Sequence, residues 1–122
     1  MEAGDPVEAE KQFRTGLALQ QEDPIFTAAL YAHLATALQM QGNNRDVESL
    51  YRKSLQLEPN YYTAHFNLGL FYRKAGRIPE AATEFEAALK ANPRSDAARQ
   101  NLRELGANHR DTESRGQERE KQ

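Results

Sequence analysis

Apolar residues recur at helical spacing along most of this chain, and glycines divide the pattern into short segments. Between residues 62 and 91 apolar residues recur at helical spacing on both sides of Gly76. Before it, Phe66 with Leu70 and Leu68 with Tyr72 are four apart; after it, Ala81, Phe85, Ala88 and Leu89 follow at intervals of four, three and one. This is the period of amphipathic helices, not the alternation of strands. A glycine at this place favours a left-handed residue that ends a helix. The pattern therefore predicts a pair of helices with a tight turn.

The same pair occurs twice, in a constant register. The shift that carries Pro59 onto Pro93 also carries Gly42 onto Gly76. It aligns several core positions as well: Leu34 with Leu68, Ala35 with Gly69, Tyr51 with Phe85, Ser54 with Ala88, and Leu55 with Leu89. A fixed period of this length is typical of repeat proteins. The second unit spans 62–95, and the first, with one added helical turn at its start, spans 24–61.

Residues 1–23 reproduce only the second half of such a unit. Ala9, Phe13 and Gly16 follow the order of the second helix, and Asp5-Pro6 is a favourable helix start with an N-cap acceptor before proline. Asp23-Pro24 has the same form and predicts the start of the lengthened helix, which runs to about Gln41. We expect the segment 1–23 to form a half unit.

The chain after residue 95 changes character in two steps. Residues 96–106 predict one more helix, which caps the stack, and Gly106 is expected to end it; its apolar side carries Ala97, Ala98, Leu102 and Leu105. Residues 107–122 contain no Leu, Ile, Val, Met or aromatic residue and carry four positive and four negative charges. Such a segment predicts a disordered polar tail.

The repeated pattern resembles the tetratricopeptide repeat family, a helix–turn–helix motif of about 34 residues with W-x2-L-G-x2-Y, then A-x3-F, then P. The second unit matches at Leu68, Gly69, Tyr72, Ala81, Phe85, Ala88 and Pro93, with His65 in the tryptophan position. The first unit is looser, with Tyr31, Ala35, Leu38, Val47 and Tyr51 at the corresponding places. The resemblance implies an all-α solenoid of antiparallel helix pairs, a right-handed superhelix of about six helices.

The amino-acid composition and the net charge exclude several classes of function. The 122 residues carry 16 Lys and Arg against 18 Asp and Glu, a net charge of −2, which gives no reason to expect nucleic acid as a partner. Cysteine is absent, so thiol chemistry and cysteine-ligated metals are excluded. No apolar run approaches the roughly 20 residues of a membrane span. We expect a cytoplasmic protein that does not insert into membranes.

No motif for catalysis stands out. Phosphate-binding glycine loops, G-x-S-x-G and H-E-x-x-H are all absent, so we expect no enzyme activity, no cofactor and no metal. His65 is expected to pack in place of an aromatic ring, and His33 and His65 differ in repeat register, which argues against a shared metal. Pairs such as Glu84 with Glu86 and Arg52 with Lys53 are expected to be solvated helix faces.

In the family, the inner face of each first helix contacts the ligand. Carried over to this sequence, the resemblance implies a peptide-binding groove formed by His33, Thr36, Gln39, Met40, Thr63, Phe66, Asn67, Leu70, Arg73, Lys74, Gln100 and Asn101. Phe66 has an alternative role, packing against the neighbouring helix. Phe66 and Leu70 beside Arg73 and Lys74 suit an amphipathic or acidic-flanked peptide.

Two family binding modes bear on this groove. His33, Asn67 and Asn101 are each one repeat period apart, and their spacing resembles the asparagine ladder of O-linked N-acetylglucosamine transferase, in which amides hold a peptide backbone. The alternative is that these residues pack neighbouring repeats together. The carboxylate clamp for chaperone tails is not expected, because Ala32, Thr36, Ala97 and Asn101 replace its lysines, asparagine and arginine.

Three functions stay open from the sequence. The first is a non-enzymatic adaptor or scaffold whose groove binds an extended or helical peptide of another protein. The second is an assembly module, in which Val7, Phe13 and Leu17 of the half unit would pair with another protomer in a homodimer. The third is a repeat segment of a larger multidomain protein such as a glycosyltransferase.

Overall fold

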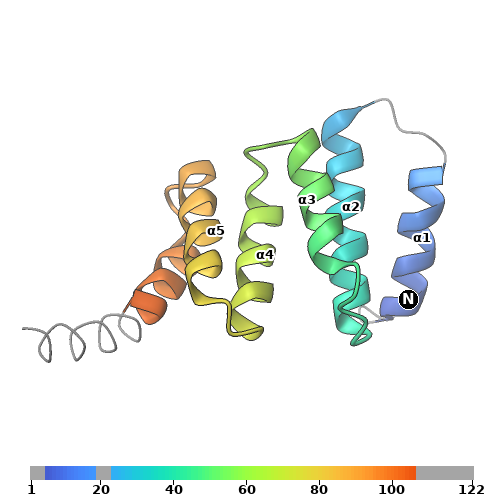
Figure 1. Cartoon of the computed structure of the whole chain (residues 1–122). Coiled ribbons are helices and arrows are strands. Elements are labelled where there is room, and N and C mark those ends of the chain that lie inside the picture. Colours follow the sequence, from blue (N-terminus) through green and yellow to red (C-terminus); the bar gives the residue numbers. More distant parts are fainter. Residues whose placement is uncertain (1–4, 19–22, 107–122) are drawn as a thin grey trace, which may run out of the picture.

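The computed structural model describes residues 5–18 and 23–106, and all regular structure within them is helical (Figure 1). The helices are α1 (Pro6–Ala18), α2 (Pro24–Met40), α3 (Val47–Leu57), α4 (Tyr62–Lys74) and α5 (Ile78–Ala91), and a further helix covers 96–106. These helices confirm the all-α solenoid that the sequence predicts. The expected polar tail, 107–122, lies outside the described residues.

The helix starts follow from their capping residues. Asp23 has an extended backbone and its Oδ1 accepts hydrogen bonds from the amides of Ile25 (2.9 Å) and Phe26 (3.5 Å). Asp5 accepts from the amide of Glu8 at 3.2 Å in the same manner. Since each cap is followed by proline, which has no amide to satisfy, both helices begin where the sequence predicts.

The helix ends use the two left-handed glycines. Gly42 and Gly76 have φ of 79° and 81°. After α2 the amides of Gly42 and Asn43 bond to the carbonyls of Gln39 and Leu38, at 3.0 and 2.9 Å. The pairs Gly76 to Arg73 and Arg77 to Tyr72 repeat this arrangement after α4, at 3.1 and 2.8 Å. These are Schellman motifs, and they explain why both first helices end at the same repeat position.

Consecutive helices pack side by side in one row from α1 to α5 (Figure 1). Each of the pairs α1–α2, α2–α3 and α4–α5 has an extensive contact, and α3 with α4 joins the two full units. The core between them alternates small and large buried residues: Ala32, Leu34, Ala35, Leu38, Val47, Leu50, Tyr51, Ala64, Leu68, Tyr72, Ala81, Phe85 and Leu105. Ser54, in a small position, is fully buried and donates its hydroxyl to the Ala28 carbonyl at 2.7 Å.

The last helix includes Gly106, which is the final described residue. Its φ is not in the left-handed region that Gly42 and Gly76 adopt. The expected end of this helix after Gly106 lies outside the described residues.

Candidate functional site

Two of the residues expected in the groove meet in a hollow at the ends of α2 and α4. Gln39 of α2 and Lys74 of α4 line it with three residues that the sequence does not predict there, namely Asn44, Phe71 and Ala75, and its volume is about 310 Å³. Phe71 supplies an apolar wall. The Gln39 and Asn44 amides and the Lys74 ammonium group supply the polar part of the lining. Sequence reasoning missed Phe71 because the family pattern assigns no ligand contact to its position.

Two exposed apolar side chains lie close in sequence to residues that line this hollow. Met40 is 61% exposed, next to Gln39, and Leu70 is 37% exposed, one turn before Lys74 on the same side of α4. A leucine and a methionine exposed to this degree have free surface to bury against another molecule. Gln39, Met40, Leu70, Phe71 and Lys74 are together called the α2–α4 surface.

The three residues of the expected ladder have partners inside the protein. Asn101 uses its amide at both ends, because its oxygen accepts from Arg73 Nη1 and its nitrogen donates to the Ala97 carbonyl at 2.9 Å. The Asn67 side chain lies close enough to the Tyr51 hydroxyl to lower its pKa. His33 stacks on Phe13 of α1, with ring centroids 5.2 Å apart. These are the contacts that the packing alternative requires.

Other expected groove residues are also engaged. The Thr36 hydroxyl donates to the Ala32 carbonyl at 3.1 Å, so the Tyr51 hydroxyl, 2.8 Å away, is the donor toward Thr36. Burial raises the pKa of Tyr51, which keeps this hydroxyl protonated. Arg73 forms an ion pair with Glu104 at 2.8 Å, and Gln100 donates to the same carboxylate at 3.4 Å. Thr63 is half-buried.

Phe66 lies against its neighbours and not free on the surface. Its ring stacks on Tyr62 with centroids 5.6 Å apart and meets Phe85 edge-on at 5.7 Å. It also packs against the buried core. Of the two roles considered for Phe66, its contacts correspond to the packing role.

A charged network on α3 joins the two full units. Glu48 accepts from Arg77 Nη1 at 2.8 Å, from the Tyr72 hydroxyl at 2.6 Å and from Arg52 Nη2 at 3.3 Å. The Arg77 guanidinium also lies 4.4 Å from the centre of the Tyr72 ring and pairs with Glu80. Arg52, expected to be a simple solvated residue, thus takes part in a network that contacts α3, α4 and the start of α5.

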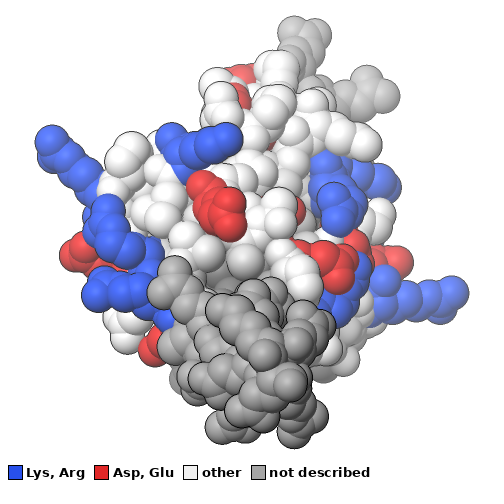
Figure 2. All heavy atoms as spheres, turned by 60° about the vertical axis from the view of Figure 1, so that its left-hand side comes forward, with Lys and Arg blue, Asp and Glu red and all other residues white. Residues whose placement is uncertain are grey.

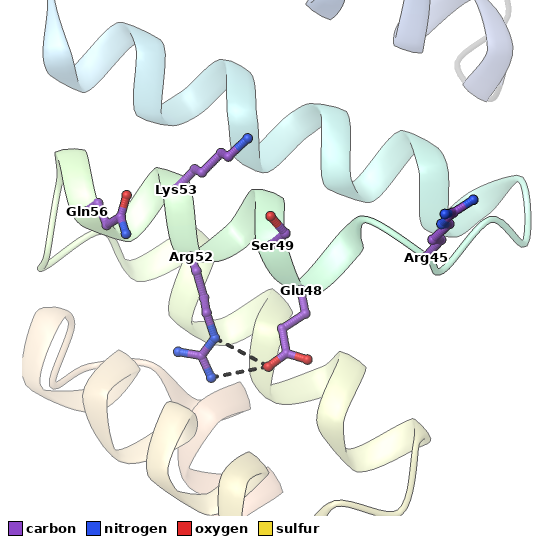
Figure 3. Close-up of a pocket in the computed structure, with 6 residues that line it drawn as sticks. All are labelled: Arg45, Glu48, Ser49, Arg52, Lys53 and Gln56. Atoms are coloured by element: carbon purple, nitrogen blue, oxygen red, sulfur yellow. Dashed lines mark hydrogen bonds and ion pairs between the residues drawn. The ribbon is translucent and has the colours of Figure 1, made fainter.

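Figure 3 shows the hollow beside this network, along α3 and the turn that precedes it. Its volume is about 510 Å³, and its lining is polar throughout: Arg45, Glu48, Ser49, Arg52, Lys53 and Gln56. Arg52 and Glu48 point toward each other there. The hydrogen bond from Arg77, followed by that from Tyr72, lowers the pKa of Glu48 to about 2. Burial, with the bond to Glu48, raises the pKa of Tyr72 to about 12.

The Glu48 network predicts a loss of stability in acid. Because its pKa is lowered in the folded state from 4.5 to about 2, Glu48 stabilises the fold above pH 4.5, and this contribution disappears as the pH falls toward 2. We expect Glu48→Gln to lower the free energy of unfolding by about 1 kcal/mol at pH 7, a modest figure because the carboxylate is a third exposed, and by much less at pH 2. Urea unfolding at both pH values measures this, with Glu86→Gln as control; equal losses at both pH values would contradict it.

His65 and Glu84 form a second pair that the sequence did not reveal. His65 Nδ1 is 2.9 Å from Glu84 Oε1, and Nε2 is 2.7 Å from the Pro59 carbonyl, so both ring nitrogens face acceptors. Each side chain of the pair is only 13% exposed, so Glu84 is not the solvated residue that the sequence predicts. Burial opposes the charged ring, but the hydrogen bonds to Glu84 and Pro59 outweigh it and raise the pKa of His65 above 6.5.

This pair predicts that stability falls at alkaline pH. A histidine whose pKa is raised on folding stabilises the protein fully below 6.5, and the contribution is lost as the pH rises through the higher folded value. We expect the free energy of unfolding to decrease by roughly 0.5–1 kcal/mol from pH 6 to pH 9 through this group. Chemical denaturation of the wild type and of His65→Gln measures the effect. An identical slope in the variant would show that His65 is not its source.

The half unit expected at the N-terminus packs on α2. Phe13 stacks on His33, and Gln41 after α2 donates to Glu10 at 2.8 Å. Phe13 and Leu17 are half-buried against the core, whereas Val7 is 55% exposed. Of the three residues expected to self-associate, Val7 therefore presents the most free surface.

The remaining surface carries charges of both signs, and Figure 2 shows Lys and Arg interspersed with Asp and Glu over the visible face. Within residues 5–18 and 23–106, no three His, Asp or Glu side chains come together as metal ligands would. None of the helices in this part of the chain has the length and apolar character needed to cross a bilayer.

The comparison with known families agrees with the geometry. The model of the tetratricopeptide repeat matches residues 33–96, more than half of the chain. This match covers the second half of α2, all of α3, α4 and α5, both left-handed glycines and the charged network described above. The chain therefore belongs to the tetratricopeptide repeat family, whose repeats generally mediate protein–protein interactions.

Curated relatives include three proteins with one shared name, probable UDP-N-acetylglucosamine–peptide N-acetylglucosaminyltransferase SPINDLY. The tomato (Solanum lycopersicum) and Petunia hybrida proteins are each 36% identical over 56 residues, 46% of this chain. The barley (Hordeum vulgare) protein is 34% identical over 68 residues, 56% of this chain. This chain spans only 6–7% of the length of these relatives.

Proposed function

We propose that this chain is an adaptor that binds an extended or helical peptide segment of another protein on the α2–α4 surface. The observation that carries the proposal is the combination of exposed Met40 and Leu70 with the hollow between Gln39, Phe71 and Lys74. Most other expected groove residues bond or stack within the protein, so they are less available to a ligand. The proposal includes a non-catalytic role without cofactor or metal, and a cytoplasmic location.

The chemistry of this surface describes the peptide. An apolar side chain of the ligand would cover Leu70 and enter the hollow against Phe71. Lys74 is exposed and has no ion pair among the described residues, so an acidic group beside the apolar one would pair with it. The Gln39 and Asn44 amides each offer a donor and an acceptor to a peptide backbone. An apolar residue flanked by an acidic one is the expected core of the ligand.

Binding is expected to depend on Leu70. Peptides selected from a random display library against the folded chain should lose roughly tenfold in affinity for Leu70→Glu, because a carboxylate replaces the apolar contact and repels the acidic flank. Leu57→Glu is a matched control, since Leu57 is 40% exposed on α3 and Leu70 37% exposed on α4. Equal affinity of both variants, measured by calorimetry, would remove the α2–α4 surface from consideration.

A second candidate is a repeat segment of a larger glycosyltransferase, and the relatives named above favour it. In that case the α2–α4 surface would select partners or substrates for a catalytic domain elsewhere in the protein. Immunoblotting of source tissue with antibodies against this chain tests this candidate. A band far above 13.8 kDa supports it, and a single band at that mass contradicts it.

Self-association through α1 is a third candidate, supported by the exposure of Val7. Sedimentation velocity of the wild type and of Val7→Glu tests it. A concentration-dependent dimer that the variant abolishes supports this candidate, and a monomer at all concentrations contradicts it. We also propose that the chain is divided into units that end at residues 23, 61, 95 and 106.

A further inference from the structure

A second apolar hollow lies between α5 and helix 96–106. Its volume is about 240 Å³, and it is lined by Ile78, Pro79, Ala82, Glu86, Leu102, Leu105 and Gly106. Glu86 is the one charged residue in this lining, and the others are apolar or glycine. A Cβ placed on Gly106 would meet no atom of the described residues within 4 Å, so these residues leave the space in front of this glycine open.

The repeat register explains why the hollow exists. Gly106 stands one repeat period after Tyr72, and the same shift carries Glu48 onto Ala82 and Arg52 onto Glu86. One unit earlier, the buried Tyr72 ring fills this place, with its hydroxyl bonded to Glu48 at 2.6 Å. Helix 96–106 carries no side chain at the position of Tyr72. The hollow therefore occupies the place that a tyrosine at position 106 of helix 96–106 would fill.

The rim of the hollow suits a phenol. Glu86 is exposed and has no hydrogen bond or ion pair in the part of the chain that the structure describes. Its position corresponds to Arg52, which donates to the Tyr72 hydroxyl one unit earlier. A carboxylate at this place would accept from a hydroxyl instead. Apolar walls with one acceptor at the edge match a tyrosine ring and its hydroxyl.

We propose that this hollow is a docking site for a tyrosine side chain presented by a partner protein, separate from the α2–α4 surface. The ring packs against Ala82, Leu102 and Leu105, and the hydroxyl donates to Glu86. The interface continues the one that Tyr72 already forms within the chain. The site does not include Leu70 or Lys74. A result that contradicts the peptide-binding proposal would therefore not contradict this one.

The experiment uses p-cresol, the side-chain analogue of tyrosine, and toluene as a probe without the hydroxyl. In methyl NMR of the full chain, p-cresol is expected to shift the Ala82, Leu102 and Leu105 methyl signals in a saturable manner. Glu86→Ala is expected to weaken the binding of p-cresol roughly two- to tenfold and to leave the binding of toluene unchanged. Gly106→Tyr fills the space from within, since Gly106 is helical without a left-handed φ, and is expected to abolish binding of both probes.

Several outcomes would overturn the proposal. One is an absence of saturable shifts in the wild type, and another is p-cresol binding that survives in Gly106→Tyr. Contacts from residues 107–122 to the Leu102 and Leu105 methyls would show that this chain fills its own hollow. A dimer in sedimentation at the NMR concentration that Gly106→Tyr dissolves would show that a second copy does so.

Discussion

Replacing Phe85 by alanine is expected to lower the free energy of unfolding by about 3–5 kcal/mol. The Phe85 ring is fully buried in α5, meets Phe66 edge-on at 5.7 Å and lies directly against Gly69 of α4. Removing it leaves a cavity in the contact that holds the second helix pair together. A loss of this size is a large part of the stability of a small domain.

Equilibrium urea unfolding followed by circular dichroism measures this loss. Thr83→Ala is a suitable control, because Thr83 lies nearer the surface of the same helix and its hydroxyl bonds to the Pro79 carbonyl. The control is expected to change stability by less than about 1 kcal/mol. A Phe85→Ala variant as stable as the control would mean that the α4–α5 contact is not the core described here.

Replacing Gly69 by valine is expected to cost about 3 kcal/mol, although glycine in the middle of a helix is usually unfavourable. An added Cβ at Gly69 would lie 2.8 Å from Phe85 Cε1 and 2.9 Å from Cδ1. The ring is completely enclosed and has no room to move aside. The close approach of α4 and α5 therefore depends on the absence of a side chain at this position.

Gly106→Val is the matched control for this experiment. Gly106 is also helical, but a Cβ there would meet no atom of residues 5–18 or 23–106 within 4 Å. We expect the control to be neutral or slightly stabilising, since valine loses less backbone entropy than glycine on folding. Thermal unfolding of the two variants compares them directly. Similar melting temperatures would show that helix propensity, and not the Phe85 contact, governs both positions.

The fold could be predicted because its determinants are local or periodic. The Asp-Pro pairs at residues 5 and 23 start helices, and Gly42 and Gly76 end them, through contacts with near neighbours in the sequence. The repeat register then places Tyr51 and Phe85 at equivalent buried positions. Each of these signals is contained in a short stretch of sequence.

The sequence could not predict which of the expected groove residues bond within the protein, because their side-chain partners lie far away in the chain. Arg73 donates a hydrogen bond to Asn101, 28 residues away, and Arg77 donates one to Glu48, 29 residues away. Spacing alone placed Asn67 and Asn101 in a row but did not show what their amides contact. The same holds for His65, whose partner Glu84 lies on another helix.

The side-chain contacts seen in the structure change the choice of residue for a binding experiment. Phe66 is a natural target from sequence, but its contacts with Tyr62 and Phe85 mean that replacing it would disturb the fold. Leu70, with 37% of its surface exposed, can be altered with less structural risk. A loss of binding in Leu70→Glu therefore reports on the surface and not on stability.

The most direct test of the central claim is methyl NMR mapping of a selected peptide bound to the full chain. We expect intermolecular contacts from the peptide to the methyl groups of Met40 and Leu70, together with shifts at Ala75 beside the hollow. Contacts confined to α1 or to α3, with Met40 and Leu70 unaffected, would contradict the assignment of the α2–α4 surface as the peptide-binding site.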